Sequence, residues 1–358
     1  MKILSGFGLA VVLLVWGTTA VVAQQAAAER QGTLVRETIT SAVLRDNRIG
    51  LDVRRNIVIY LPPGYTSSGK AYPVVYYCHN IFQNAEQLFS SGRLERLLNR
   101  AFSRGVCRDF ILVAADYSSS TSGSLYENSS TSGRWLDFTT HELVPFIDGK
   151  FRTLRSRDCR AVVGDFMGGR GALKLGMTHA DLFSVVYALH PVATGRGYIP
   201  WSYVDADWSK IYAAKTFGEL AGAGRSQIMV AICQAFLPNP NRPPFYCDFF
   251  MEPKDGVPVF HVDHTAKIQD GFLLERTLDD AAVNLRSLRG LAFDWARYDQ
   301  TTSHIVSAVE FSRKLDDLGI EHEAEEYRGN PWDKLWTDDG RFYSRLLPFV
   351  NNSLVFEK

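Results

Sequence analysis

The stretch 160–172, which reads RAVVGDFMGGRGA, constrains the fold of this chain more than any other. A short apolar run meets Gly164, and Gly168 and Gly169 follow before a helix-like segment, 171–177. This order predicts a strand, a sharp turn and a helix, because glycine is needed where a turn is strained and two backbones pass close together. A turn of this kind holds one side chain up at the carboxyl end of the strand.

The side chain at the apex of this turn is that of Phe166. A benzyl group has no lone pair and no ionisable proton, so it cannot attack a carbonyl carbon. A shift of one residue would place Asp165 at the apex, but Val163 and Met167 would then stand at the two positions that need glycine. The sequence therefore predicts an unreactive side chain at the apex.

Buried strands and amphipathic helices alternate along most of the chain. Continuous apolar runs such as 72–79 predict strands buried on both faces, and helical spacing predicts the helices between them. Besides the strand before the turn, the predicted strands are 34–43, 56–61, 72–79, 110–115, 183–189, 291–296 and 321–327, and the predicted helices are 93–104, 135–147, 171–177, 278–288, 303–318 and 342–350.

This pattern predicts an α/β fold with a mostly parallel central sheet and helices on both faces. The first two strands, 34–43 and 56–61, are expected to form an antiparallel pair. The alternation stops between 191 and 275, in a segment rich in aromatic residues and prolines. We interpret this segment as a lid or insertion within one domain, 24–358.

Composition and the amino terminus limit the compartment and the partners. The 358 residues are 46% hydrophobic and carry a formal net charge of zero, so neither nucleic acid nor an anionic membrane surface is indicated as a partner. Residues 1–23 resemble a secretory signal peptide, with Lys2 before an apolar run from Phe7 to Trp16, and with Val21-Val22-Ala23 before Gln24. The run is short for a transmembrane anchor, which is the alternative. We expect a secreted or periplasmic protein without a stable membrane span.

Export would permit disulfide bonds, and the count of five cysteines leaves at least one thiol unpaired within a monomer. Cys233 and Cys247 enclose a proline-rich loop and are the expected pair. Cys78 lies within an apolar strand and is expected to be a buried free thiol. No cofactor or metal site is predicted, and the sequence does not indicate an oligomeric state.

Several segments together resemble the esterase-D or "putative esterase" branch of the α/β-hydrolases, which includes feruloyl and acetylxylan esterases and S-formylglutathione hydrolases. The matching stretches are NIVIYLPPGY, YPVVYYCH, GRWLDFTTHELVPFIDGKFRT, the glycine-rich turn with GRGALKLGMTHADLFSVV, and IEHEAEEYRGNPW. The resemblance implies an α/β-hydrolase fold, in which the turn at 160–172 is the nucleophile elbow, G-x-S-x-G.

The resemblance also implies a catalytic triad in the order serine, aspartate, histidine. Phe166 stands at the serine position and Asp299 at the aspartate position, whereas Pro331 stands where the histidine is expected. Proline has no side-chain proton and cannot act as a general base. With two members replaced, we expect that serine hydrolase activity has been lost.

The loop that helps to form the oxyanion hole is also altered, because the His-Gly of the family is His79-Asn80 here. The oxyanion-loop positions are Asn80, Ile81 and Met167. We expect the altered site to bind a small aromatic, carbohydrate or apolar ligand. The aromatic residues expected to line this pocket are Trp135, Trp201 and Trp332, although packing of the lid is an alternative use of such side chains.

Two other functions remain open. The pocket could host a lyase, cyclase, isomerase or transferase with His190 as acid or base and Asp299 as its partner, because His190 ends the strand after the elbow and should face the top of the sheet. A hydrogen bond from His190 to the lid backbone is the simpler alternative. His304 could also enter the pocket, although it is more simply a residue of a helix first turn. The other open function is residual carboxylic ester hydrolysis.

Overall fold

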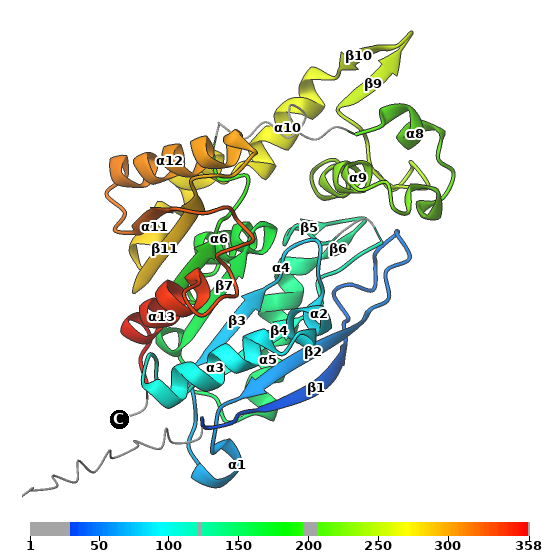
Figure 1. Cartoon of the computed structure of the whole chain (residues 1–358). Coiled ribbons are helices and arrows are strands. Elements are labelled where there is room, and N and C mark those ends of the chain that lie inside the picture. The colour runs from blue at the N-terminus through cyan, green and yellow to red at the C-terminus, as the bar shows by residue number, and fades with distance from the viewer. Residues whose placement is uncertain (1–28, 121–122, 196–205, 357–358) are drawn as a thin grey trace, which may run out of the picture.

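A sheet of eight strands forms the centre of the computed structural model, which describes residues 29–120, 123–195 and 206–356 (Figure 1). The strand order is β1-β2-β4-β3-β7-β8-β11-β12. β2 is antiparallel to both β1 and β4, and the remaining neighbours are parallel, which confirms the predicted sheet. The strands are β1 (Thr33–Thr40), β2 (Arg54–Leu61), β3 (Val74–Cys78), β4 (Ile111–Ala115), β7 (Arg160–Asp165), β8 (Val185–Leu189), β11 (Gly290–Ala296) and β12 (Glu323–Tyr327).

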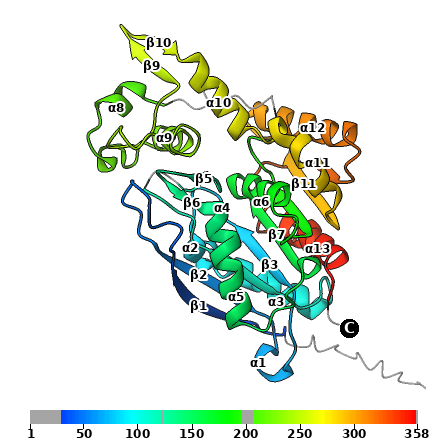
Figure 2. The same cartoon turned by 180° about the vertical axis from the view of Figure 1, so that it is seen from behind.

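Helices cover both faces of this sheet, as the opposite views in Figures 1 and 2 show. One face packs against α2 (Ala85–Ser90), α3 (Arg93–Arg104) and α13 (Leu347–Ser353). The other face packs against α4 (Trp135–Asp137), α5 (Val144–Lys150), α6 (Met167–Thr178), α11 (Leu278–Arg286) and α12 (Thr302–Asp317). A π-helical segment, Phe138–Leu143, joins α4 to α5, and a short helix, α1 (Tyr65–Ser68), follows β2.

The apolar pattern of the sequence explains this layering. Every residue of β3 and of β7 is buried, because helices lie on both sides of these central strands. In α3 the leucines at 94, 97 and 98 lie on the buried face. The helix stops at Gly105, whose φ of 68° lies in the left-handed region that favours glycine.

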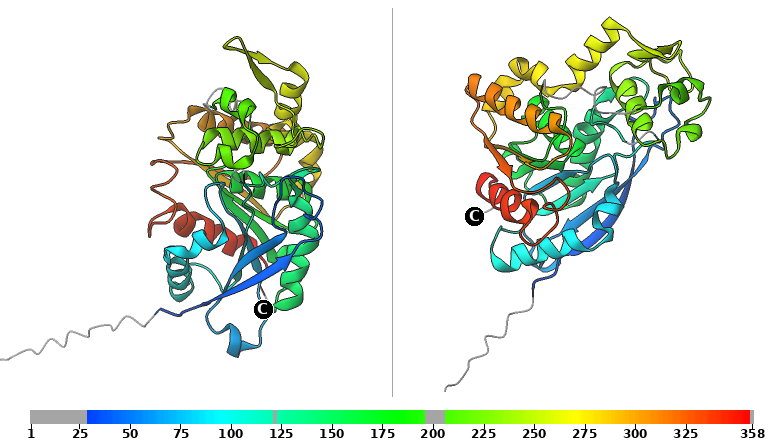
Figure 3. Two further views of the ribbon diagram at one scale, coloured as in Figure 1. Left: turned by 90° about the vertical axis from the view of Figure 1, so that its right-hand side faces the viewer. Right: turned by 45° about the horizontal axis from the view of Figure 1, so that its top comes forward.

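The predicted lid has helices of its own and a hydrophobic core that is continuous with Met167 of the main fold. It contains α8 (Trp208–Ala213), α9 (Arg225–Phe236), the hairpin of β9 (Met251–Lys254) and β10 (Val257–Phe260), and α10 (Val262–Phe272). Figures 1 and 3 show this segment beyond one edge of the sheet, with the hairpin pointing away from the rest of the chain. The sequence of α9 has no visible helical period because most of its residues are buried, so apolar side chains occupy every face.

Arg170 connects the elbow helix to this segment. Its side chain is fully buried and donates hydrogen bonds to the carbonyl oxygens of Phe272, at 2.9 Å, and Leu125, at 3.1 Å. It also forms an ion pair of 2.8 Å with Glu127. The buried guanidinium therefore links the end of α10 to α6 and to the loop before β5 (Asn128–Ser129), which pairs with β6 (Gly133–Arg134).

The cysteines correct one prediction. All five are buried free thiols, so the expected Cys233–Cys247 disulfide is not formed. Both lie in the hydrophobic core of the lid, where burial raises the pKa of each thiol and disfavours the thiolate that disulfide formation requires. The prediction that Cys78 is a buried free thiol is confirmed.

The predicted signal peptide, 1–23, lies outside the described residues. Within the described part of the chain, no helix combines the length and the apolar character needed to cross a membrane.

Candidate functional site

The turn between β7 and α6 has the geometry of a strained elbow. Phe166 has a φ of 54° and a ψ of −114°, which a residue with a side chain rarely adopts. A Cβ atom at Gly164 would lie 2.4 Å from the carbonyl oxygen of Gly168, and one at Gly168 would lie 2.0 Å from the carbonyl oxygen of Cys78. Both positions therefore require glycine, and the predicted register of the elbow is correct. Asp165 is the last residue of β7 and is buried below the apex.

The Phe166 side chain is half-buried and lies among aromatic rings. Its ring centroid is 5.9 Å from that of Phe82, 5.3 Å from that of Trp332 and 5.4 Å from that of His304. It forms part of the wall of an open cleft of about 380 Å³. The cleft is lined by Ile81, Phe82, Phe166, Met167, Gly224, Arg225, Ile228, Asp299, Thr301, His304, Pro331 and Trp332.

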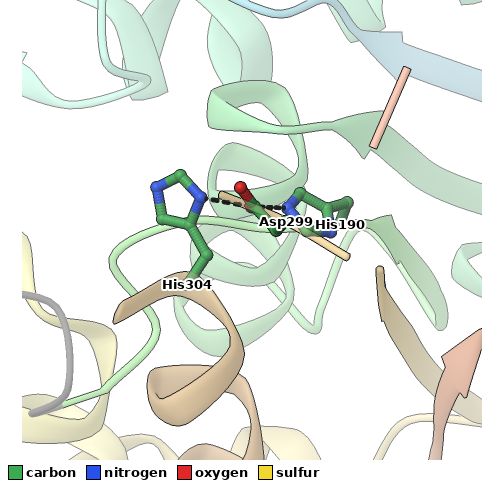
Figure 4. A group of neighbouring side chains, drawn as sticks. All are labelled: His190, Asp299 and His304. Atoms are coloured by element: carbon green, nitrogen blue, oxygen red, sulfur yellow. Dashed lines mark hydrogen bonds and ion pairs between the residues drawn. The ribbon is translucent and has the colours of Figure 1, made fainter. Parts of the chain in front are cut away.

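His190 follows β8 and lies close to Phe166, but both of its ring nitrogens are engaged, one of them by Asp299 as Figure 4 shows. Nε2 lies 2.7 Å from Oδ2 of Asp299, and Nδ1 accepts a hydrogen bond from the backbone N–H of Ala296 at 3.0 Å. Because Nδ1 accepts, the proton of the neutral ring is on Nε2 and points at the carboxylate. His190 is therefore placed to orient Asp299 and has no nitrogen left to act as a base toward the cleft.

Asp299 also binds His304, which lies in the first turn of α12. Oδ2 of Asp299 is 2.7 Å from Nδ1 of His304, and both side chains are less than a tenth exposed. Burial works against the ionised carboxylate, but the hydrogen bonds from His190 and His304 outweigh it and lower the pKa of Asp299. Burial lowers the pKa of His304, although its hydrogen bond with Asp299 acts in the opposite direction. The pair is thus a carboxylate beside a neutral imidazole at pH 7.

The same three residues bring one possible metal-ligand atom each within 4.8 Å of one another. A metal ligand must offer a lone pair, so Nε2 of His190 would have to lose its proton. That would leave an imidazolate, since Nδ1 already accepts from Ala296. The hydrogen-bond pattern therefore fits a carboxylate that orients two histidines better than it fits a metal centre.

The loop at the oxyanion position is held by Asn80. Its Nδ2 donates to Oδ2 of Asp165 at 2.7 Å, and its Oδ1 accepts from the backbone N–H of Phe82 at 2.9 Å. Burial raises the pKa of Asp165, which also accepts a hydrogen bond of 2.7 Å from the Tyr77 hydroxyl. Ile81 and Met167 line the cleft. The backbone N–H of Met167 belongs to the first turn of α6, where helical N–H groups have no partner within the helix.

The tryptophans predicted to line the pocket have three different outcomes. Trp332 lies at the rim of the cleft and is 52% exposed. Trp135 instead lies in the main hydrophobic core, where its indole N–H donates to the carbonyl oxygen of Ser132, because α4 turns this face toward the sheet. Trp201 lies outside the described residues.

The residue pattern indicated His304 only weakly and did not indicate Phe82 or Arg225 as cleft residues. The spacing of His304 from Asp299 was a usable signal, because a helix that starts just after a strand-end aspartate returns its first turn to that carboxylate. Phe82 follows the altered loop directly. Arg225 belongs to the lid, so only the tertiary structure could place it in the cleft.

Comparisons with known proteins agree with this geometry. A family model described as "Putative esterase" matches residues 50–235, just over half of the chain. Esterase Rv1288 from Mycobacterium tuberculosis is 35% identical over 130 residues, which are 35% of this chain and 26% of that protein, so this chain matches about a quarter of its curated relative.

Solved structures share the fold. A ferulic acid esterase superposes with a TM-score of 0.61 at 19% identity, covering 91% of this chain and 99% of that one. The S-formylglutathione hydrolase FrmB from Staphylococcus aureus superposes with a TM-score of 0.55 at 14% identity, covering 90% of this chain and all of its own (100%). These neighbours establish the α/β-hydrolase fold. Identities this low say nothing about the substrate.

Proposed function

This chain belongs to the putative esterase family, and we propose that it uses the family's fold to bind a small ligand with an aromatic or apolar body rather than to cleave esters through a serine. The observation that carries the proposal is Phe166 at the apex of a preserved elbow. The elbow strain is retained, yet the side chain that it presents has no nucleophilic atom. Pro331 beside it offers no proton carrier either.

The walls of the cleft support the ligand class. The rings of Phe166, Phe82 and Trp332 contact one another, and the side chains of Phe82 and Trp332 are about half exposed. Exposed rings arranged in this way can stack on a flat ligand or on the apolar face of a sugar. Arg225 on the lid adds a positive charge to the lining, and the one carboxylate of the lining, Asp299, is less than a tenth exposed and already bonded to two histidines, which favours a ligand with an anionic group.

Loss of serine chemistry is tested with a fluorophosphonate probe and p-nitrophenyl acetate on the purified protein. We expect no labelling and no turnover above a heat-treated control. Labelling at any serine with stoichiometry near one, or turnover that the probe abolishes, would establish residual ester hydrolysis and overturn the proposal.

Ligand binding is tested by titration with 1-anilinonaphthalene-8-sulfonate, an anionic aromatic dye whose fluorescence rises in apolar sites. Trp332→Ala should weaken dye affinity about tenfold, since a stacked ring together with its buried area is worth about 1.4 kcal/mol. The matched control is Phe260→Ala, which removes a ring that is 46% exposed on the β9–β10 hairpin outside the cleft. Equal affinities for the two variants would show that the dye does not occupy the cleft.

Export remains part of the proposal and rests on residues 1–23. Expression of the full chain in a secreting host, followed by amino-terminal sequencing of the mature protein, tests it. We expect the mature chain to begin at Gln24, and an uncleaved intracellular chain would contradict export. A non-hydrolytic enzyme that uses His190 as its base is less well supported, because both ring nitrogens of His190 already form hydrogen bonds, one with Asp299 and one with the backbone of Ala296.

A further inference from the structure

A second cavity, of about 520 Å³, lies at the opposite end of the central sheet from the cleft. Pro73 and Asp109 on its wall come just before β3 and β4, whereas Phe166 in the cleft comes just after β7, which is parallel to β3. Figures 1 and 2 show the same separation, since α1, whose Ser68 lines this cavity, and α9, whose Arg225 lines the cleft, lie at opposite ends of the sheet. We call this cavity the basal pocket.

Three positive charges and one negative charge line the basal pocket. The cations are those of Arg30, Lys70 and Arg108, and the one carboxylate is that of Asp109. At neutral pH all four groups are ionised at their ordinary pKa values. The lining therefore carries a net charge of two positive units, which favours an anionic ligand.

The carboxylate of Asp109 is already bound by Arg30. Nη1 and Nη2 of Arg30 donate to the two carboxylate oxygens at 3.0 and 2.6 Å. This bidentate pair uses both oxygens, so these two residues balance one another. The two positive charges that remain belong to Lys70 and Arg108.

Lys70 presents an ammonium group that the protein does not use. Its side chain is exposed, and within the described residues its Nζ atom forms no hydrogen bond or ion pair. Its backbone is nevertheless fixed, because the N–H donates to Oγ of Ser68 at 3.3 Å and the carbonyl oxygen accepts from Nε of Arg152 at 3.0 Å. The ammonium group is therefore anchored at the pocket with its three donors available.

Arg108 is held in place by contacts outside the pocket charges. Its guanidinium carbon lies 3.8 Å from the centroid of the Phe356 ring, and Nη2 donates to the carbonyl oxygen of Asn351 at 2.8 Å. Nε donates to Oδ1 of Asn351 at 3.2 Å, whereas Nη1 takes part in neither bond. Because these contacts already restrain the side chain, binding of an anion would immobilise little additional motion.

We propose that the basal pocket binds the dianion of a phosphate monoester, with Lys70 and Arg108 on the phosphate and the organic part against the apolar wall of Tyr72, Pro73 and Phe102. A phosphate monoester carries nearly two negative charges at pH 7 and offers three acceptor oxygens, which matches the two uncompensated cations. The apolar wall favours an ester over free phosphate, because covering apolar surface is favourable. This site is separate from the cleft and does not depend on the ligand proposed there.

Titration calorimetry of the purified protein with phenyl phosphate at low salt tests the site. Lys70→Gln and Arg108→Gln should each weaken binding about tenfold, because each removes a charge-assisted hydrogen bond. Lys70→Gln is the decisive variant, since it breaks no side-chain hydrogen bond within the described residues. Two controls should keep the wild-type affinity. Lys267→Gln removes an exposed charge from α10 outside both cavities, and Arg225→Gln removes the cation of the cleft.

Three outcomes would overturn the proposal. Equal losses in Lys70→Gln and Lys267→Gln would show a general effect of net charge, and a loss confined to Arg225→Gln would assign the ester to the cleft. Absence of binding by the wild-type protein at millimolar phenyl phosphate is the third. The cleft ligand is tested with the dye and Trp332→Ala, so failure of one proposal can be told apart from failure of the other.

Two other ligands test the chemical class. Benzenesulfonate has the same ring but a single negative charge, and it should bind about tenfold more weakly than phenyl phosphate. Inorganic phosphate lacks the ring and should also bind more weakly. Equal affinity for benzenesulfonate would contradict a dianion site, and equal affinity for inorganic phosphate would contradict an ester site.

A phosphate monoester is either a soluble compound or the headgroup of a lipid, and vesicles distinguish these sources. Sedimentation with phosphatidylcholine vesicles that contain phosphatidic acid, and its loss in Lys70→Gln, would assign a lipid headgroup. Lys70-dependent binding of phenyl phosphate without sedimentation would assign a soluble ester. Neither sedimentation nor binding of phenyl phosphate would mean that the basal pocket is not a phosphate site.

Discussion

Nδ1 of His304 lies 2.7 Å from Oδ2 of Asp299, and the two residues are joined by the short connection between β11 and α12. The first turn of α12 thus brings a histidine back to the aspartate that precedes it. This local contact places an acid–base pair beside Phe166 without help from the loop after β12, where Pro331 lies. The site therefore lacks a nucleophile at the elbow but contains a carboxylate–imidazole pair.

Phe166→Ala should destabilise the protein by about 1–2 kcal/mol. Fully buried phenylalanines cost about 3–5 kcal/mol when truncated, but the Phe166 ring is only half-buried and borders an open cleft. Phe311→Ala is the matched control, because Phe311 is 1% exposed in the main core and should show the full loss. Urea unfolding of both variants measures the difference. Equal losses would mean that Phe166 is a core residue and not part of a binding wall.

Arg170→Met should cost about 3–5 kcal/mol, because it removes the partner of the largely buried Glu127 and leaves the carbonyl oxygen of Phe272 without its donor. Lys174→Met is the control and should cost less, since Glu127 would keep its bond with Arg170. Hydrogen exchange should also rise in α10, whose last residue is Phe272, in the Arg170 variant alone. Unchanged exchange there would show that Arg170 does not hold the lid segment.

Asn80→Ala should cost about 1–3 kcal/mol, because Asp165 is buried and loses one of its hydrogen-bond donors. The pKa of Asp165, already raised by burial, should rise further. A carboxyl group with a raised folded pKa binds more protons in the folded state, so the loss should be larger at pH 7 than at pH 5. Gln83→Ala, which removes a weaker bond to Asn80, is the control. Urea unfolding of both variants at the two pH values measures this, and a loss independent of pH would contradict it.

Acidification should destabilise the wild-type protein more than the His304→Gln variant. The folded pKa of His304 lies below the ordinary 6.5, because burial disfavours the charged ring. The unfolded chain then binds more protons as the pH falls below 6.5, so this contribution is complete above that pH and decreases as the pH falls toward the folded pKa. Melting temperatures at pH 7 and pH 5 measure the effect. Parallel shifts for the two proteins would show that His304 is not buried in its neutral form.

The sequence by itself determined the elbow and most strands and helices of the central fold, but not those of the lid segment. Strands such as β3 and β7 are apolar along their length and have to be covered on both faces. Because such strands alternate with amphipathic helices along the chain, the sequence favours a parallel sheet between two layers of helices. The glycines at 164 and 168 determined the turn, because any Cβ atom there would collide with the backbone. Phe166 at the apex followed directly.

Only the tertiary structure decided which polar groups meet. Asp299 accepts the backbone N–H of Thr301 through Oδ1 and contacts His190 and His304 through Oδ2, and side-chain rotations that no residue pattern encodes bring these partners together. Trp135 shows the same limit, since an aromatic side chain can serve a core or a cleft with the same sequence signal. Hydrophobic periodicity is a local property and can be read along the chain, whereas hydrogen-bond partners and cleft walls arise from residues distant in sequence and are fixed only when the elements pack.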